Sequence, residues 1–222
     1  MSNQAIPDII SIVGSAYLQP IADLLEKLLS DPPAGHGVAG SGLHENGYSA
    51  ATIILLMAVL ESYTARVRFA RRNEAVSTNL STPDLLEKYY PELPTKNELI
   101  ESFLCRNVVA HNHVWHLDVS DFETLGSPTL ATPQELGFQT NKHYQDVVNV
   151  LSRRTKILGL NINPIAVDRT DVRKVFSVVW ETLKHMNEKS FSDTPLTSFQ
   201  AIKFRGSRRS FEQILEALVK DD

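Results

Sequence analysis

The segment 49–72 constrains the fold most, because it is densely apolar along its middle and abruptly polar at its end. It contains no charged residue before Glu61, and several arginines follow within its last turns. A helical segment that is apolar on all sides usually lies at the centre of a bundle. The sequence therefore predicts a long core helix over these residues.

Other stretches carry apolar residues at the spacing typical of helices. They span residues 6–29, 82–90, 96–115, 142–158, 171–189 and 210–220. Pro20 interrupts the first stretch, which predicts a kinked helix or two short ones. Thr170 or Asp171 is the expected cap of the helix 171–189. The Gly-rich segment 34–47 and the segment 191–197 are predicted as connectors, and residues 116–137 as a loop with room for a small hairpin.

These elements predict an all-α protein, a helical bundle of four to five core helices with an irregular insert and a C-terminal helical appendage. A chain of 222 residues is long enough to bury a single apolar core. We expect one helical domain over residues 1–222. Within it, residues 48–190 form the core, 1–47 an N-terminal helix with the Gly-rich loop, and 191–222 the appendage.

The overall charge is −4, which argues against binding nucleic acid through net charge but leaves room for local basic patches. One basic cluster ends the long helix and consists of Arg66, Arg68, Arg71 and Arg72. A second precedes the last helix and consists of Lys203, Arg205, Arg208 and Arg209. Two interpretations of the first cluster stay open: cations stabilise the C-terminal end of a helix dipole, and they also suit a polyphosphate backbone.

The single cysteine, Cys105, excludes an internal disulfide and a thiolate metal cluster. It lies in an apolar helical stretch, so we expect it to be a small buried side chain. The N-terminus lacks a secretory pattern. The longest apolar run, residues 53–60, is far shorter than the ~20 residues that cross a bilayer. We therefore expect a cytoplasmic protein without a membrane partner.

The candidate chemistry lies in the six residues from Arg106 to His111. On an ideal helix each residue advances by about 100°, so Asn107 and His111 face the same way. A hydrogen bond between them would set which imidazole nitrogen carries the proton. Arg106 lies one step round, and the small Ala110 on its row leaves space above the helix. We expect the guanidinium and the imidazole to converge on one ligand.

This pair suits phosphodiester chemistry. An imidazole can take a proton from a ribose 2′-hydroxyl or return one to a leaving oxygen near neutral pH. A guanidinium offers a fixed fork of donors to the non-bridging phosphate oxygens. One Arg and one His are few for a complete site, so we expect two copies to meet across a two-fold axis and supply both an acid and a base.

The element Arg106-Asn107-x-x-x-His111 resembles the signature of the HEPN superfamily (higher eukaryotes and prokaryotes nucleotide-binding). The run Leu-Glu-Ser-Tyr at 60–63 in the preceding long helix is also similar to what such proteins carry. The resemblance covers residues 49–189, and the Arg-Asn…His element is its specific part. It implies a bundle of four or five helices, a homodimer whose motifs face each other, and metal-independent endoribonuclease activity, often in toxin–antitoxin or antiviral systems.

Carried onto this sequence, the resemblance makes Arg106 the phosphate clamp, His111 the general acid and base, and Asn107 the neighbour that orients them, with Glu61 as a supporting residue. Some family toxins have a Tyr two residues after the His, which a partner enzyme modifies. His113 stands at that position here. Adenylylation at this position is therefore not expected, and His113 is a further supporting candidate. RNA, a second copy and a protein antitoxin or regulator are the implied partners.

A metal site is the competing interpretation of the histidines His111, His113 and His116 with Asp118. His111 and His113 point about 200° apart on a helix, and an open zinc site would still need a defined carboxylate. We therefore expect neither a metal nor a cofactor.

Two alternatives to a nuclease stay open. A module of the same fold could bind RNA or a nucleotide through Arg106 and the two basic clusters without turnover. A structural or regulatory helical protein could use Arg106 only to pair with a carboxylate such as Glu61.

Overall fold

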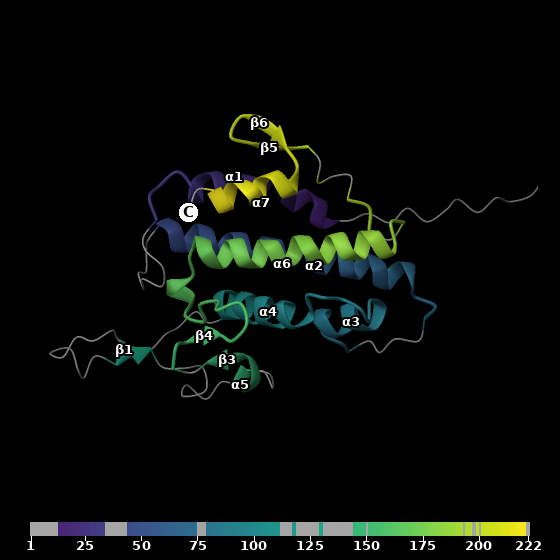
Figure 1. Ribbon diagram of the computed structural model, residues 1–222, viewed down its shortest axis with the longest axis horizontal. Helices are drawn as coiled ribbons and strands as arrows, with labels where there is room; N and C mark the ends of the chain where they lie inside the picture. Colours follow the sequence, from purple (N-terminus) through teal and green to yellow (C-terminus); the bar gives the residue numbers. More distant parts are fainter. Residues whose placement is uncertain are drawn as a thin grey trace, which may run out of the picture.

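The computed structural model describes residues 13–33, 44–74, 79–111, 117–118, 129–130, 144–149, 151–192, 194–196, 199 and 201–220. Most of these residues are helical, which confirms the all-α expectation. The helices form three layers (Figure 1). Helices α2 (His44–Ala70) and α6 (Arg169–Lys189) lie side by side in the middle. Helices α1 (Leu18–Leu28) and α7 (Phe211–Lys220) cover one side, and α3 (Thr82–Tyr89) and α4 (Lys96–His111) the other.

Short elements complete the described part of the chain. Two 3₁₀ helices, η1 (Val13–Tyr17) and η3 (Pro164–Ala166), precede α1 and α6, and the short helix α5 spans Tyr144–Val147. Six short strands pair antiparallel in twos: β1 (Leu117–Asp118) with β2 (Thr129–Leu130), β3 (Val148–Asn149) with β4 (Arg154–Thr155), and β5 (Ile202–Phe204) with β6 (Ser207–Arg209). The β1–β2 pair agrees with the small hairpin allowed for in residues 116–137.

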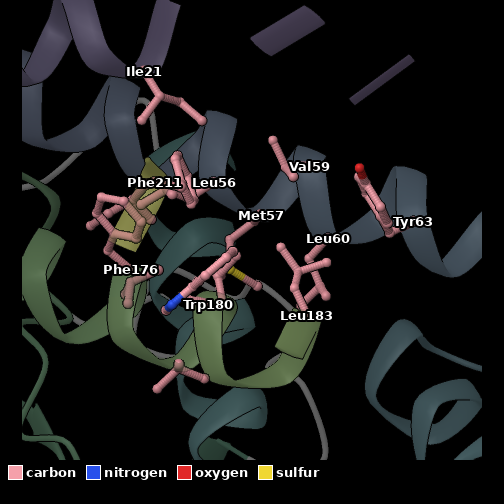
Figure 2. Close-up of a cluster of buried hydrophobic side chains, with 14 of the residues drawn as sticks. Ile21, Leu56, Met57, Val59, Leu60, Tyr63, Phe176, Trp180, Leu183 and Phe211 are labelled. Carbon is pink, nitrogen blue, oxygen red and sulfur yellow. The ribbon is translucent and has the colours of Figure 1, made fainter. Parts of the chain in front are cut away.

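The core lies between the three layers, with α2 at its centre as expected. Leu56, Met57 and Leu60 of α2 are fully buried. Figure 2 shows the side chains from α1, α2, α6 and α7 that meet there, among them Ile21, Leu56, Met57, Leu60, Phe176, Trp180, Leu183 and Phe211. Helix α2 is long and apolar enough to cross a membrane by length and composition alone, and half of its most apolar window is buried inside the fold. Its neighbours on both sides account for that apolarity.

Two helix boundaries near the N-terminus follow from local and long-range contacts. Pro20 lies in the first turn of α1, where its missing N–H is not needed, and η1 precedes it. The sequence predicts a kinked helix or two short ones broken at Pro20; the described residues have two short helices, but the change from η1 to α1 falls before Leu18 and Pro20 lies inside α1. Helix α2 already begins at His44, so residues 44–47 are helical and not part of the Gly-rich loop. Asn46 accounts for this early start, because its side chain donates to the carbonyls of Pro164 and Val167.

The predicted helix 142–158 is wrong over residues 148–149 and 151–158, where the β3–β4 hairpin and its exit lie. The Asn149 side chain accepts hydrogen bonds from the backbone N–H groups of Leu151 and Ser152, at 3.1 and 3.2 Å. Arg153 has φ of 51°, in the left-handed region. Hydrogen bonds from a side chain to nearby backbone groups give the chain an alternative to the helix. Here they prevail over the helical preference that the spacing of the apolar residues indicates.

Buried carboxylates fix the segment after this hairpin. Glu101 of α4 is fully buried and accepts hydrogen bonds from the backbone N–H groups of Ile157 and Leu158, at 2.8 and 2.7 Å. Asp171 of α6 accepts hydrogen bonds from the backbone and the side-chain amide of Asn161, at 3.0 and 2.8 Å. Irregular backbone is thereby held against α4 and α6 with its amides satisfied.

The cap of α6 differs from the expected Thr170 or Asp171. Asp168 is the N-cap residue, and its carboxylate accepts hydrogen bonds from the N–H groups of Thr170 and Asp171. The Asp171 carboxylate accepts the return bond from the Asp168 N–H, at 3.1 Å, which completes a capping box. The helix therefore starts two residues earlier than predicted, at Arg169.

The C-terminal segment predicted as an appendage supplies buried side chains to the main core. They are Phe199, Ile202, Phe204, Phe211, Ile214 and Leu218. Strand β5 packs on α1 and α7 packs on α6. The expectation that Cys105 is buried is confirmed, and burial raises the pKa of its thiol well above the usual range.

Candidate functional site

Arg106 lies on the face of α4 that meets α2. Its Nη2 forms an ion pair with Oε1 of Glu61 in α2, with 21% of the arginine side chain and 40% of the glutamate side chain exposed. The guanidinium carbon also lies 5.5 Å from the ring centroid of Phe103, which is one turn earlier on α4. A carboxylate and an aromatic face therefore hold the guanidinium in one orientation.

An open cavity of about 420 Å³ adjoins this ion pair, between α2, the start of α3 and α4. Arg106, Asn107 and Glu61 line it, so the structure brings three of the sequence candidates to one site. The other lining residues come from α4, from the first turn of α3 and from the two residues before it: Leu80, Ser81, Thr82, Pro83, Asp84, Lys96, Ile100 and Phe103. Seven of the eleven lining residues are polar or charged, so the cavity suits a polar ligand more than an apolar one.

Lys96 brings a second cation to the cavity, ten residues before Arg106 on α4 and so about 15 Å away along the helix axis. Its ammonium lies 2.5 Å from Glu87 Oε1 of α3. At the start of α3, Ser81 Oγ donates to Asp84 Oδ2 at 2.6 Å. Sequence reasoning missed Lys96 and Asp84, because only the antiparallel packing of α3 against α4 brings them to the same cavity.

His111 is the last residue of α4, and its side chain lies outside the described residues. Helix geometry puts its backbone about 6 Å beyond Asn107 along the axis and about 40° round from it. The expected hydrogen bond between Asn107 and His111 stays a prediction. His113 and His116 also lie outside the described residues.

The end of the first basic cluster has structural contacts at helix termini. Arg71 donates to the carbonyl of Tyr89, at the end of α3, and its guanidinium carbon lies 5.5 and 5.2 Å from the ring centroids of Tyr89 and Tyr90. Arg72 donates to the carbonyl of Phe69 and lies 4.6 Å from its ring centroid. These contacts favour the helix-end interpretation for Arg71 and Arg72.

The other two arginines of this cluster point to different surroundings. Arg66 donates to the carbonyl of Ser192, beyond the end of α6. Arg68 lines a second open cavity of about 380 Å³, together with Ala65, Phe69, Arg71, Arg72, Glu74 and Tyr89. Arg68 lies seven residues beyond Glu61, so both face the same side of α2. A role of these arginines in binding RNA stays a prediction.

The second basic cluster is not brought to Arg106. Lys203, Arg205, Arg208 and Arg209 are exposed on the β5–β6 hairpin. Figure 1 shows this hairpin beyond the α1–α7 layer, whereas α4 lies on the opposite side of the α2–α6 layer. One short ligand segment therefore cannot contact both.

Within the described residues, no group of three His, Cys, Asp or Glu side chains is arranged to hold a metal ion. Comparisons with protein-family models, with curated proteins and with solved structures found no match to this chain.

Proposed function

We propose that this chain is a metal-independent endoribonuclease of the HEPN type, which cleaves RNA with Arg106 and His111 at a site completed by a second copy of the chain. The observation that carries the proposal is the position of Arg106, which Glu61 and Phe103 hold at the wall of the open cavity. The setting that the resemblance implies is a toxin or an antiviral effector in the cytoplasm.

Arg106 has the donors that a phosphate clamp needs. A guanidinium carries five N–H donors, and the recorded ion pair with Glu61 is made through Nη2. The remaining donors can address the non-bridging oxygens of a phosphate at the cavity wall, where negative charge grows as the phosphorus is attacked. The orientation imposed by Glu61 lowers the cost of organising the guanidinium in the transition state.

The cavity suits the nucleoside next to that phosphate. Apolar side chains such as Pro83, Ile100 and Phe103 supply walls for a base or sugar, and Asn107 adds an amide beside Arg106. His111 follows Asn107 by one turn, so its imidazole is assigned the proton transfers.

The reaction follows from these roles. One imidazole takes the proton of a ribose 2′-hydroxyl, and the oxygen attacks the adjacent phosphorus. The bond to the 5′-oxygen of the next nucleotide breaks, and His111 of the second copy protonates that oxygen. The products are a 2′,3′-cyclic phosphate and a free 5′-hydroxyl, and no water is consumed in this step.

The test is incubation of the purified chain with mixed RNA and a chelator, beside Arg106→Ala and His111→Ala. We expect cleavage that persists in the chelator, leaves 2′,3′-cyclic phosphate ends, and falls by about 10²–10⁴-fold in each variant. Lys88→Ala is the matched control, because Lys88 is an exposed cation on α3 that does not line the cavity. Circular dichroism and thermal melting of each variant check the fold. Full activity in a folded His111→Ala variant would refute the proposal.

A binding protein without turnover is the second candidate, because Arg106 at the cavity wall could hold a phosphate without any proton transfer. In that case RNA affinity falls steeply with salt while no cleavage appears. The Glu61–Arg106 ion pair also fits a structural or regulatory protein that uses Arg106 only for this pair, and a chain that binds no RNA at low salt would favour that role.

A further inference from the structure

The β5–β6 hairpin places two like charges directly opposite each other. Its register pairs Ile202 with Arg209, Lys203 with Arg208, and Phe204 with Ser207. The two residues between the strands, Arg205 and Gly206, have φ of 49° and 74°. These values are typical of the two-residue turn that matches the twist of a hairpin.

The two faces of this hairpin differ in kind. Ile202 and Phe204 are only 3% and 2% exposed and belong to the main core. Side chains alternate along a strand, so Lys203 and its partner Arg208 share the opposite, outer face. Both side chains are exposed. Among the residues that the structure describes, no carboxylate forms an ion pair with either of them.

Opposed like charges in a cross-strand pair destabilise a hairpin, so this pair has a cost that the fold does not offset locally. The hairpin is nevertheless held firmly on α1. Lys203 and Gln19 exchange two hydrogen bonds, from the Lys203 N–H at 3.0 Å and to the Lys203 carbonyl at 2.8 Å. The Arg205 N–H donates to the Glu26 carboxylate. The outer face is therefore presented to solvent in a fixed orientation.

We propose that the outer face of this hairpin is a separate docking site for the RNA backbone, in which Lys203 and Arg208 straddle one phosphate. Directly opposed residues have Cβ atoms about 4.5–5.5 Å apart, which allows both cations to reach the same anion. A bound phosphate removes the repulsion between them. The inference concerns binding alone and holds whether or not the chain cleaves RNA.

Two observations define the partner and its place. The apolar side chains of the hairpin, Ile202 and Phe204, are buried, so the hairpin has no wedge to insert into a bilayer, and a soluble polyanion fits it better than a lipid surface. The hairpin lies across the α2–α6 layer from the Arg106 cavity (Figure 1). An RNA molecule that reaches both sites must pass round the protein, so only a long RNA can contact the hairpin and the Arg106 cavity at once.

The test uses the full chain and fluorescence anisotropy with long, single-stranded, labelled 2′-O-methyl RNA, which cannot form the cyclic phosphate. Lys203→Gln with Arg208→Gln is compared with Lys27→Gln with Lys88→Gln, a control pair of exposed cations with the same change in net charge. We expect the hairpin variant to bind about tenfold more weakly at low salt, and its salt slope to fall by about 0.7, the value for one lost phosphate contact on a single strand. The control pair should change the RNA affinity and the salt slope only as far as the loss of two positive charges from the whole protein does.

A single substitution separates binding from folding. Lys203→Glu converts the opposed like charges into an opposed ion pair, so it should raise the melting temperature by about 1–3 °C while it weakens RNA binding. A variant that melts lower, or binds RNA as the wild type does, would overturn the proposal. Equal affinities for the hairpin variant and the control pair would also overturn it. So would binding of the wild type to phosphatidylserine vesicles without binding to RNA.

Discussion

Arg169 and Glu45 form a buried ion pair, with Nε 2.9 Å from Oε1 and only 6% and 7% of the two side chains exposed. Arg169 also donates to the carbonyls of Leu28 and Asp31, at 3.2 and 3.1 Å. The pair thus connects the first turns of α2 and α6 with the end of α1. Arg169 thereby satisfies the carbonyl of Leu28, one of those that the end of α1 leaves without a partner within the helix.

Glu45→Ala should lower the free energy of unfolding by about 3–5 kcal/mol, because it leaves the Arg169 charge buried and unpaired. Urea denaturation followed by circular dichroism measures this change. Glu92→Ala is the control, because it removes an exposed ion pair with Lys189 and should leave the midpoint unchanged. Equal midpoints for the two variants would contradict the structural role of the Glu45–Arg169 pair.

Glu61→Gln should slow RNA cleavage by about 10–100-fold, since Arg106 loses the carboxylate that orients it. The effect is expected in kcat more than in KM. Because the ion pair is partly exposed, unfolding should become easier by no more than about 1 kcal/mol. Single-turnover kinetics and urea denaturation measure the two quantities, with Glu92→Gln as the exposed control. A larger loss of stability with unchanged cleavage would assign the pair to the fold alone.

Asp171 should make stability fall as the pH rises from mildly acidic values. Burial, followed by the nearby Asp168 carboxylate, raises the pKa of Asp171 above its usual 3.8, although hydrogen bonds from Asn161 and the Asp168 N–H act in the other direction. The folded chain therefore keeps this proton to higher pH than the unfolded chain does. Between the two pKa values only the unfolded chain releases it, so the contribution of Asp171 to stability decreases through that window.

Asp171→Asn should remove this part of the pH dependence. It should also lower stability at every pH, because the amide would turn an N–H₂ group toward donors of Asn161 or Asp168. Denaturation at a series of pH values from 3.8 upward measures both effects. A pH profile parallel to that of the wild type would show that another group titrates in this range.

The sequence predicts α1, α6 and α7 well because their apolar residues repeat at helical spacing, and α2 because it is apolar on all sides along its middle. The prediction fails over residues 148–149 and 151–158, where the Asn149 side chain and the left-handed backbone of Arg153 favour a hairpin. The buried ion pair that stabilises the fold is also not indicated by the sequence around either of its residues. Glu45 and Arg169 are 124 residues apart, and nothing in either neighbourhood indicates that they meet.

The site was anticipated in part. The sequence predicts the helix that carries Arg106 and Asn107 from its many apolar residues, and it offers Glu61 as a candidate partner of Arg106. The cavity beside them could not be foreseen, because Lys96 and residues 80–84 enter it only through the packing of α3 against α4. The separation of the β5–β6 hairpin from Arg106 likewise depends on the layer arrangement and not on any local pattern.

The C-terminal residues that lie in the core have a consequence for folding during translation. Ile21, Leu25 and Leu28 of α1 are fully buried, and strand β5, whose first residue is 202, packs on this helix. Because translation proceeds from the N-terminus, α1 leaves the ribosome more than 170 residues before that strand is made. The nascent chain therefore carries an apolar surface that chaperones can bind until the last layer closes, whereas α2, α3 and α4 are already available to assemble the Arg106 cavity.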